Sequence, residues 1–190
     1  MSGSRAAHAR NLVGPLIRST YRINVHGGEN LPRHGSVLVL CDWNNIAAPS
    51  VLKSGLSRPL HVWAAGPAGL PGPLMSVTGD LAMPEGRPGI PVVSNVVELL
   101  ERGEAVVAIG VTDIGYVLAR SGAPVITARV QAPATKRPTD PPARKSEITV
   151  TMGVPHDLPE RFVGARPAIG VTRAAGEWAR QRLVDEVSSE

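Results

Sequence analysis

The chain has 190 residues, of which 43% are hydrophobic and 19% charged, a balance typical of one folded globular domain rather than of a disordered segment. Its single cysteine, Cys41, excludes an intramolecular disulfide, and no Cys/His cluster has the spacing of a zinc site. The net charge of +4 favours anionic partners such as phosphates or anionic lipid surfaces. It does not favour nucleic acid, because there is no dense Lys/Arg stripe and aromatic residues make up only 3% of the chain.

The first 20 residues are expected to form an amphipathic segment ahead of a single domain over residues 21–190. Apolar residues within 6–18 fall on one side of a helix, although Pro15 would kink or break it. Two interpretations remain open, a helix on a membrane surface and a helix packed on its own domain. The N-terminus lacks the apolar core of a secretory signal, and no apolar run approaches the roughly 18 residues that span a bilayer. We therefore expect a cytoplasmic protein, at most peripheral to the membrane.

The first half of the domain reads as strands with one helix between them. Residues 21–27 alternate between polar and apolar side chains, as in a half-buried strand. Residues 36–40 are continuously apolar, apart from a leading serine, which is typical of a central strand covered on both faces. A helix is predicted over 46–56 with Pro49 in its first turn, and a further strand over 59–65.

Residues 89–103 show the clearest helical pattern in the sequence. Ser94 is the expected N-cap, and Gly103 the expected stop. A buried strand is predicted over 104–110, followed by a short helix over 113–122.

The last part of the chain begins with a third buried strand, over 123–131. Residues 132–146 contain four prolines and four basic residues, and they are expected to form a solvated loop rather than a linker to another domain. A strand over 147–153 and a final helix over 171–188 follow, with Thr172 as the expected N-cap.

Strands that alternate with helices favour the α/β class, in a single domain with a mostly parallel central sheet flanked by helices. Ligands of such sheets collect at the carboxyl ends of the strands. The strand ends of interest here follow Leu40, Ala65 and Ile109.

The lead-in YRINVHGGENLPRHGSVLVLCD, residues 21–42, resembles the opening of the glycerolipid acyltransferase superfamily, the lysophosphatidic acid (1-acylglycerol-3-phosphate) acyltransferases. Similarity continues in NVVELLERGEAVVAIG, SGAPVITARV and EITVTMGVPHDLP, so that the resemblance covers residues 11–187. It implies the α/β fold of that family.

The first catalytic motif implied by this resemblance is altered. In the family, an Asn-His pair is followed by an Asp five residues after the His, and the imidazole takes the proton of a glycerol hydroxyl while the carboxylate orients the ring. The Asn, His and Asp positions are here Cys41, Asp42 and Ala47. The nearest other histidines, His34 and His61, do not have the required spacing.

The remaining motifs of the family also depart from their usual residues. The phosphate-binding Arg of the second motif falls near Met83, and Arg87 replaces it only if the loop is threaded differently. The Glu of the third motif, which contacts the acceptor, is Val111. In the fourth motif the first Pro is kept as Pro124, whereas the second is Thr127.

Two aspartates are candidates for acid–base catalysis. Asp42 ends a buried strand, and Asp113 follows the strand of the third motif. Burial raises the pKa of a carboxyl and lets it act as a base near neutral pH. The alternative is that Asp42 and Asn44 cap the turn or helix that follows. The other residues expected to line the cleft are Cys41, Asn44, Asn45, Asp80, Glu85, Arg87, Val111 and Thr112.

Cys41 is expected to be a small buried thiol rather than a nucleophile, because no histidine nearby in the sequence would ionise it.

Four altered motifs on an intact scaffold favour a protein that has lost acyl transfer and serves as a binding or complex-forming subunit beside a partner enzyme. One alternative is an enzyme reused for an acylated or anionic small molecule, for example in secondary metabolism, with Asp42 and Asp113 as acid and base. Another is acyl transfer from acyl-CoA or acyl-carrier protein with an unusual base. We expect no cofactor, no metal and no nucleic acid. The expected partner is an enzyme or a second copy of the chain, with weak peripheral membrane contact.

Overall fold

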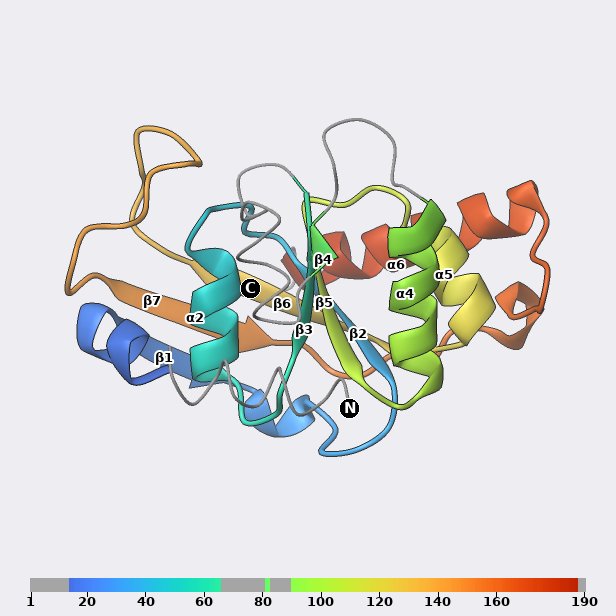
Figure 1. Cartoon of the computed structure of the whole chain (residues 1–190), viewed down its shortest axis with the longest axis horizontal. Coiled ribbons are helices and arrows are strands. Elements are labelled where there is room, and N and C mark those ends of the chain that lie inside the picture. Colours follow the sequence, from blue (N-terminus) through green and yellow to red (C-terminus); the bar gives the residue numbers. More distant parts are fainter. Residues whose placement is uncertain (1–13, 66–80, 83–89, 188–190) are drawn as a thin grey trace.

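The computed structural model describes residues 14–65, 81–82 and 90–187. At its centre lies a seven-stranded sheet in the order β1-β7-β6-β2-β5-β3-β4 (Figure 1). The strands are β1 Arg22–His26, β2 Val37–Cys41, β3 His61–Ala64, β4 Leu81–Ala82, β5 Ala105–Ile109, β6 Val125–Gln131 and β7 Glu147–Met152. The helices are α2 Ala48–Gly55, α4 Ile90–Glu101, α5 Ile114–Ser121 and α6 Ile169–Val187, with 3₁₀ turns η1 Gly28–Asn30 and η3 Glu160–Phe162. Residues 14–20 are also helical.

The pairing of the strands is parallel except between β6 and β7. Strand β2 lies at the centre, with β5 on one side and β6 on the other. A parallel sheet needs crossover connections, and the helices that make them cover its faces. The predicted α/β class with a mostly parallel sheet is therefore confirmed.

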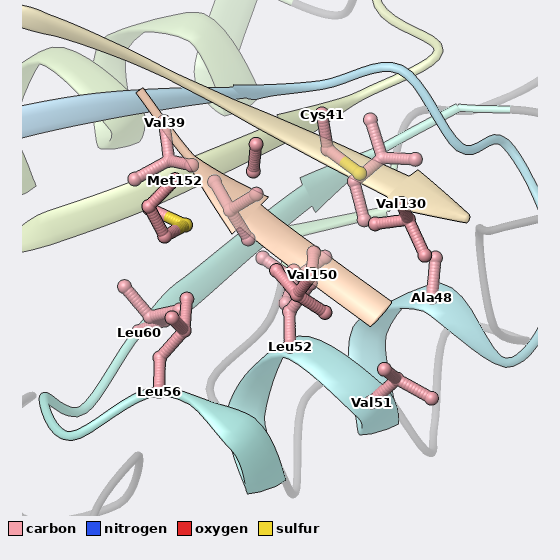
Figure 2. Packing of buried hydrophobic residues seen from close by; sticks show 14 of the residues in the cluster. Val39, Cys41, Ala48, Val51, Leu52, Leu56, Leu60, Val130, Val150 and Met152 are labelled. Atoms are coloured by element: carbon pink, nitrogen blue, oxygen red, sulfur yellow. The ribbon is translucent and has the colours of Figure 1, made fainter. Parts of the chain in front are cut away.

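Alternate residues of β2 face two different layers of the core. Val37, Val39 and Cys41 belong to the cluster that includes α2, and Figure 2 shows Val39 and Cys41 on the α2 side of the sheet. Leu38 and Leu40 belong to the cluster formed with α4, α5 and α6. Because both faces of β2 are buried, the strand has the unbroken apolar run that the sequence displays.

Several predicted element boundaries are wrong. Ser94 is not an N-cap, because α4 begins at Ile90 and Ser94 lies within it. Thr172 is not an N-cap either, because α6 begins at Ile169. The two-residue strand β4 was not expected, since so short a pairing leaves no periodic pattern.

The helix over residues 14–20 contacts the domain. The Arg18 guanidinium donates to the main-chain oxygen of Ser54 from Nε at 3.1 Å and from Nη2 at 2.6 Å. Ile17 packs against the α2 side of the core, whereas Leu16 is exposed. These contacts agree with the interpretation of a helix packed on its own domain. Within the described ranges, no helix is long and apolar enough to cross a membrane.

Helices α5 and α6 cross at two glycines, Gly115 and Gly176. A Cβ atom on Gly115 would lie 2.9 Å from the main-chain nitrogen of Gly176 and would collide with the main-chain oxygen of Thr172. We expect Gly115→Ala to lower the free energy of unfolding by about 1–3 kcal/mol, because the helices would have to separate. Urea unfolding followed by circular dichroism measures this change.

Gly170→Ala is the matched control, because Gly170 also lies in a helix but has nothing within 4 Å of an added Cβ. It should leave stability unchanged or raise it by up to about 1 kcal/mol. Equal stability of the two variants would contradict the close crossing.

Candidate functional site

The carboxyl ends of β2, β3 and β5 meet at one edge of the sheet. Ile109 pairs in register with Cys41 on one side and with Ala64 on the other. Beyond these ends, Gly110 has a positive φ of 65°, and a Cβ there would lie 2.6 Å from Nδ2 of Asn44 and 3.0 Å from the main-chain oxygen of Ala65. The Asn44 side chain therefore lies directly over Gly110, and the structure brings the segments after all three strands together.

Asp42 ends the hydrogen-bond ladder between β2 and β6. Cys41 pairs with Ala128, and the Asp42 N–H donates to the Ala128 oxygen at 3.3 Å. In a parallel ladder the next bond would join the Val130 N–H to the main-chain oxygen of Asp42. Here the Val130 N–H donates to Oδ1 of the Asp42 side chain, at 2.9 Å. The carboxylate thus takes over a main-chain role at the point where β2 leaves the sheet.

The pKa of the Asp42 carboxyl is raised above its usual value, mainly by burial. The hydrogen bond from Val130 and the positive charge of Arg129 oppose this shift. Although the residue as a whole is exposed, its carboxylate lies against the end of the sheet, and this position shields the carboxylate partly from water.

Asn45 makes a capping-type contact before α2. Its side chain is 2% exposed, and its Oδ1 accepts the Ala47 N–H at 2.9 Å, as in an Asx turn. Its Nδ2 donates to the main-chain oxygen of Asp140 at 3.0 Å. Ala47 itself is the N-cap of α2, with no side-chain cap and only 8% exposure.

The proline-rich segment 132–146 is mostly exposed, as expected of a solvated loop. It nevertheless binds the turn after β2, through Asp140 and through a bond from the Ile46 N–H to the Pro138 oxygen at 3.2 Å. The segment therefore also holds the β2–α2 turn in place.

Cys41 lies in the core rather than on the wall of a cleft. Its exposure is 7%, and it belongs to the same buried cluster as Val130 and Ala48 (Figure 2). Burial raises the pKa of the thiol to about 12, and the thiol lies 3.9 Å from the main-chain oxygen of Trp43. The predicted burial of the thiol is therefore confirmed, and so high a pKa leaves little of the nucleophilic thiolate at neutral pH.

The residues after β5 divide between the core and a surface cavity. Val111 packs against the core layer of α4, α5 and α6. Thr112 and Asp113 are exposed and line a cavity of about 390 Å³ between α5 and α6. Arg180 of α6, which was not among the predicted site residues, also lines it and donates to the Thr112 oxygen at 3.2 Å.

Asp113 is the N-cap residue of α5, and its side chain makes no capping bond. The Asp42 carboxylate binds β6, whereas Asp113 follows β5, and these two strands flank β2 on opposite sides. Among the described residues, no hydrogen bond joins the two aspartates. Three other expected cleft residues, Asp80, Glu85 and Arg87, lie outside the described residues.

Each histidine in the described part of the chain lies away from the carboxyl end of β2. His34, His61 and His156 lie at the amino ends of β2, β3 and β6, and His156 exchanges main-chain bonds of 2.8 Å with Val125. His26 ends β1, which β7 and β6 separate from β2. Within the same ranges, no group of three or more His, Cys, Asp or Glu residues could hold a metal ion.

The stabilities of the variants Asp42→Asn and Asp42→Ala test whether the Asp42 side chain has a structural role. Asparagine retains an oxygen for the Val130 N–H, so Asp42→Asn should be at least as stable as the wild type at pH 7. Asp42→Ala leaves that N–H without its acceptor and should cost about 1–2 kcal/mol. Urea unfolding measures both values, and equal losses in the two variants would contradict the role of the Val130 bond.

The pH dependence of the same pair has a definite sign. A raised pKa in the folded state means that Asp42 supports folding most at low pH and less as pH rises through the folded-state pKa. The free energy of unfolding of Asp42→Asn, relative to that of the wild type, should therefore increase as pH rises from below 4 to 7. A decrease over this range would contradict the raised pKa of Asp42.

Iodoacetamide labelling tests the state of Cys41. With a pKa of about 12, the folded protein should resist alkylation at pH 8, because almost no thiolate is present and the sulfur is buried. The same protein in guanidinium chloride should react fully, as mass spectrometry would record. Alkylation of the folded protein at the rate of a free thiol would exclude the buried position.

Comparisons with known proteins support the fold. No family model matches the chain, and no curated protein matches it. The structure is similar to the crystal structure of the 1-acyl-sn-glycerophosphate (LPA) acyltransferase PlsC from Thermotoga maritima, with a TM-score of 0.58 and 12% sequence identity. The match covers 97% of this chain and 81% of that chain. At this identity the likeness establishes the fold alone: the chain has an α/β fold like that of a lysophosphatidic acid acyltransferase.

Proposed function

We propose that the chain is a glycerolipid acyltransferase relative that no longer transfers acyl groups and that acts as a binding or complex-forming subunit beside a partner enzyme. The observation that carries the proposal is the end of β2. The position of the catalytic His is Asp42, whose carboxylate accepts the Val130 N–H, and the position of the Asp is the buried Ala47.

Acyl transfer to a hydroxyl needs a base that takes the hydroxyl proton as the new ester bond forms. In the family an imidazole does this, held in place by a carboxylate. At the end of β2, Asp42 stands in place of the imidazole and Ala47 in place of the orienting carboxylate, and the described histidines lie elsewhere on the sheet. Cys41 offers no replacement, because its thiol stays protonated at neutral pH.

The segment after β5 supports the same conclusion. The position of the Glu that contacts the acceptor in the family is Val111, which packs against the helical layer of the core. An apolar side chain in this place provides no acceptor for a hydroxyl of a glycerol phosphate. The loss therefore extends beyond one motif and affects both proton transfer and acceptor binding.

A complete scaffold without these groups suits a binding role, because the sheet and both helical layers remain packed. Reuse of Asp42 and Asp113 in a different reaction is the competing proposal. It receives some support from the raised pKa of Asp42, but Asp42 is bound to β6 and Asp113 lies beyond β5.

Purification of the tagged chain from its own cells, followed by activity assays of the complex, tests the subunit role. We expect an enzyme to co-elute with the chain. The activity of this enzyme should fall at least severalfold when the chain is removed. It should return when either the wild-type chain or the Asp42→Asn variant is added back. A chain that restores activity only with Asp42 intact would favour the reused enzyme. A chain that elutes alone and leaves every assayed enzyme unaffected would contradict the subunit role.

A further inference from the structure

Strand β1 has an open edge. Among the strands of residues 14–65, 81–82 and 90–187 it is bonded to β7 alone, with Arg22 paired to Glu147 and the Arg22 N–H donating to the Ser146 oxygen at 2.9 Å. In a parallel pair, alternate residues direct both main-chain groups to the same neighbour. The N–H and C=O groups of Ile23 and Val25 therefore point away from β7. A row of such groups at the margin of a sheet can accept another strand.

A groove runs along this edge. One cavity of about 470 Å³ is lined by Arg22, Ile23 and their neighbours, and a second of about 730 Å³ continues toward Arg33. The two cavities share Val25 and Gly55 in their linings, so they adjoin each other beside β1.

Gly55 at the end of α2 forms part of the wall of the groove. A Cβ at Gly55 would lie 3.2 Å from Cγ2 of Ile23 and 3.1 Å from Cγ2 of Val25. The helix end therefore rests on these two side chains of β1, which give the groove an apolar base. Their main-chain groups remain directed toward the open margin.

The groove is basic. Arg18, Arg22, Arg33 and Arg58 line it, against Glu29 as the acidic residue of its lining. Arg22 and Arg33 are exposed, whereas Arg18 and Arg58 are held in place by main-chain oxygens.

The four arginines of the lining outnumber Glu29, so the groove is positively charged and favours an acidic ligand.

We propose that an extended, acidic segment of the partner protein binds this groove and pairs its main chain with the open edge of β1. The inference rests on the proposed role as a complex-forming subunit. Main-chain pairing supplies affinity in this mode of recognition, and the side chains of the added strand supply specificity. An anionic membrane would match the charge of the groove but would make no use of the N–H and C=O groups of Ile23 and Val25.

Binding of a fluorescein-labelled ten-residue peptide, in which glutamate alternates with threonine, tests the proposal by fluorescence anisotropy. The double variant Arg22→Glu with Arg33→Glu should weaken binding at least about tenfold, because it reverses two exposed charges of the groove. Arg166→Glu is the matched control, since Arg166 is exposed in the segment before α6 and should leave binding unchanged.

A second peptide, N-methylated at every residue so that neither of its edges can donate, tests the pairing with the wild-type chain and needs no variant to fold. It retains every charge but cannot form the ladder, so it should bind at least about tenfold more weakly. Equal binding of the two peptides, or equal loss in the double variant and the control, would overturn the proposal. A third outcome would also overturn it: the peptide does not bind, while the wild-type chain, unlike the double variant, co-sediments with phosphatidylglycerol vesicles.

The complex purified from cells separates this inference from the proposed function. If the double variant still assembles with the partner enzyme and restores its activity, the groove is not the binding site, although the subunit role stands. If no partner depends on the chain, the proposed function fails even if the peptide binds.

Discussion

The structure depends on a strand that is buried on both faces. Strand β2 lies between β5 and β6 with a helical layer on either side, so its main-chain polar groups cannot reach water and must be paired. Where β2 leaves the sheet, side chains must complete this pairing. Asp42 accepts the Val130 N–H, and Asn45 bonds both Ala47 and Asp140. The polar residues that first suggest an active site are thus used to end a buried strand.

The sequence was sufficient to predict the strands other than β4, most of the helices and the α/β class, because these depend on the spacing of apolar residues. Helix starts were harder to predict. Ser94 and Thr172 have the chemistry of N-caps, but α4 and α6 begin upstream of them. Val92 and Val93 pack against the core, whereas Ile169 at the start of α6 is exposed. The strand β4 has only two residues, too few for a period to be recognised.

The roles of the candidate site residues could be predicted only in part. The buried thiol of Cys41 followed from its neighbours in the sequence. The partner of Asp42 is Val130, 88 residues away, and the partner of Asn45 is Asp140, 95 residues away. No local pattern indicates such contacts, because they arise from the pairing of β2 with β6 and from the loop that follows β6.

The account assigns different roles to two regions of one sheet. At the carboxyl end of β2, Asp42 stands where the resemblance expects an imidazole, while beside β1 the main-chain groups of Ile23 and Val25 point away from β7. The measurement that tests the central claim most directly is phosphatidic acid formation from acyl-CoA and lysophosphatidic acid by the purified chain, followed by mass spectrometry. The account expects a rate no higher than that without protein and no difference between wild type and Asp42→Asn. Product formation above this background that Asp42→Asn abolishes would contradict it.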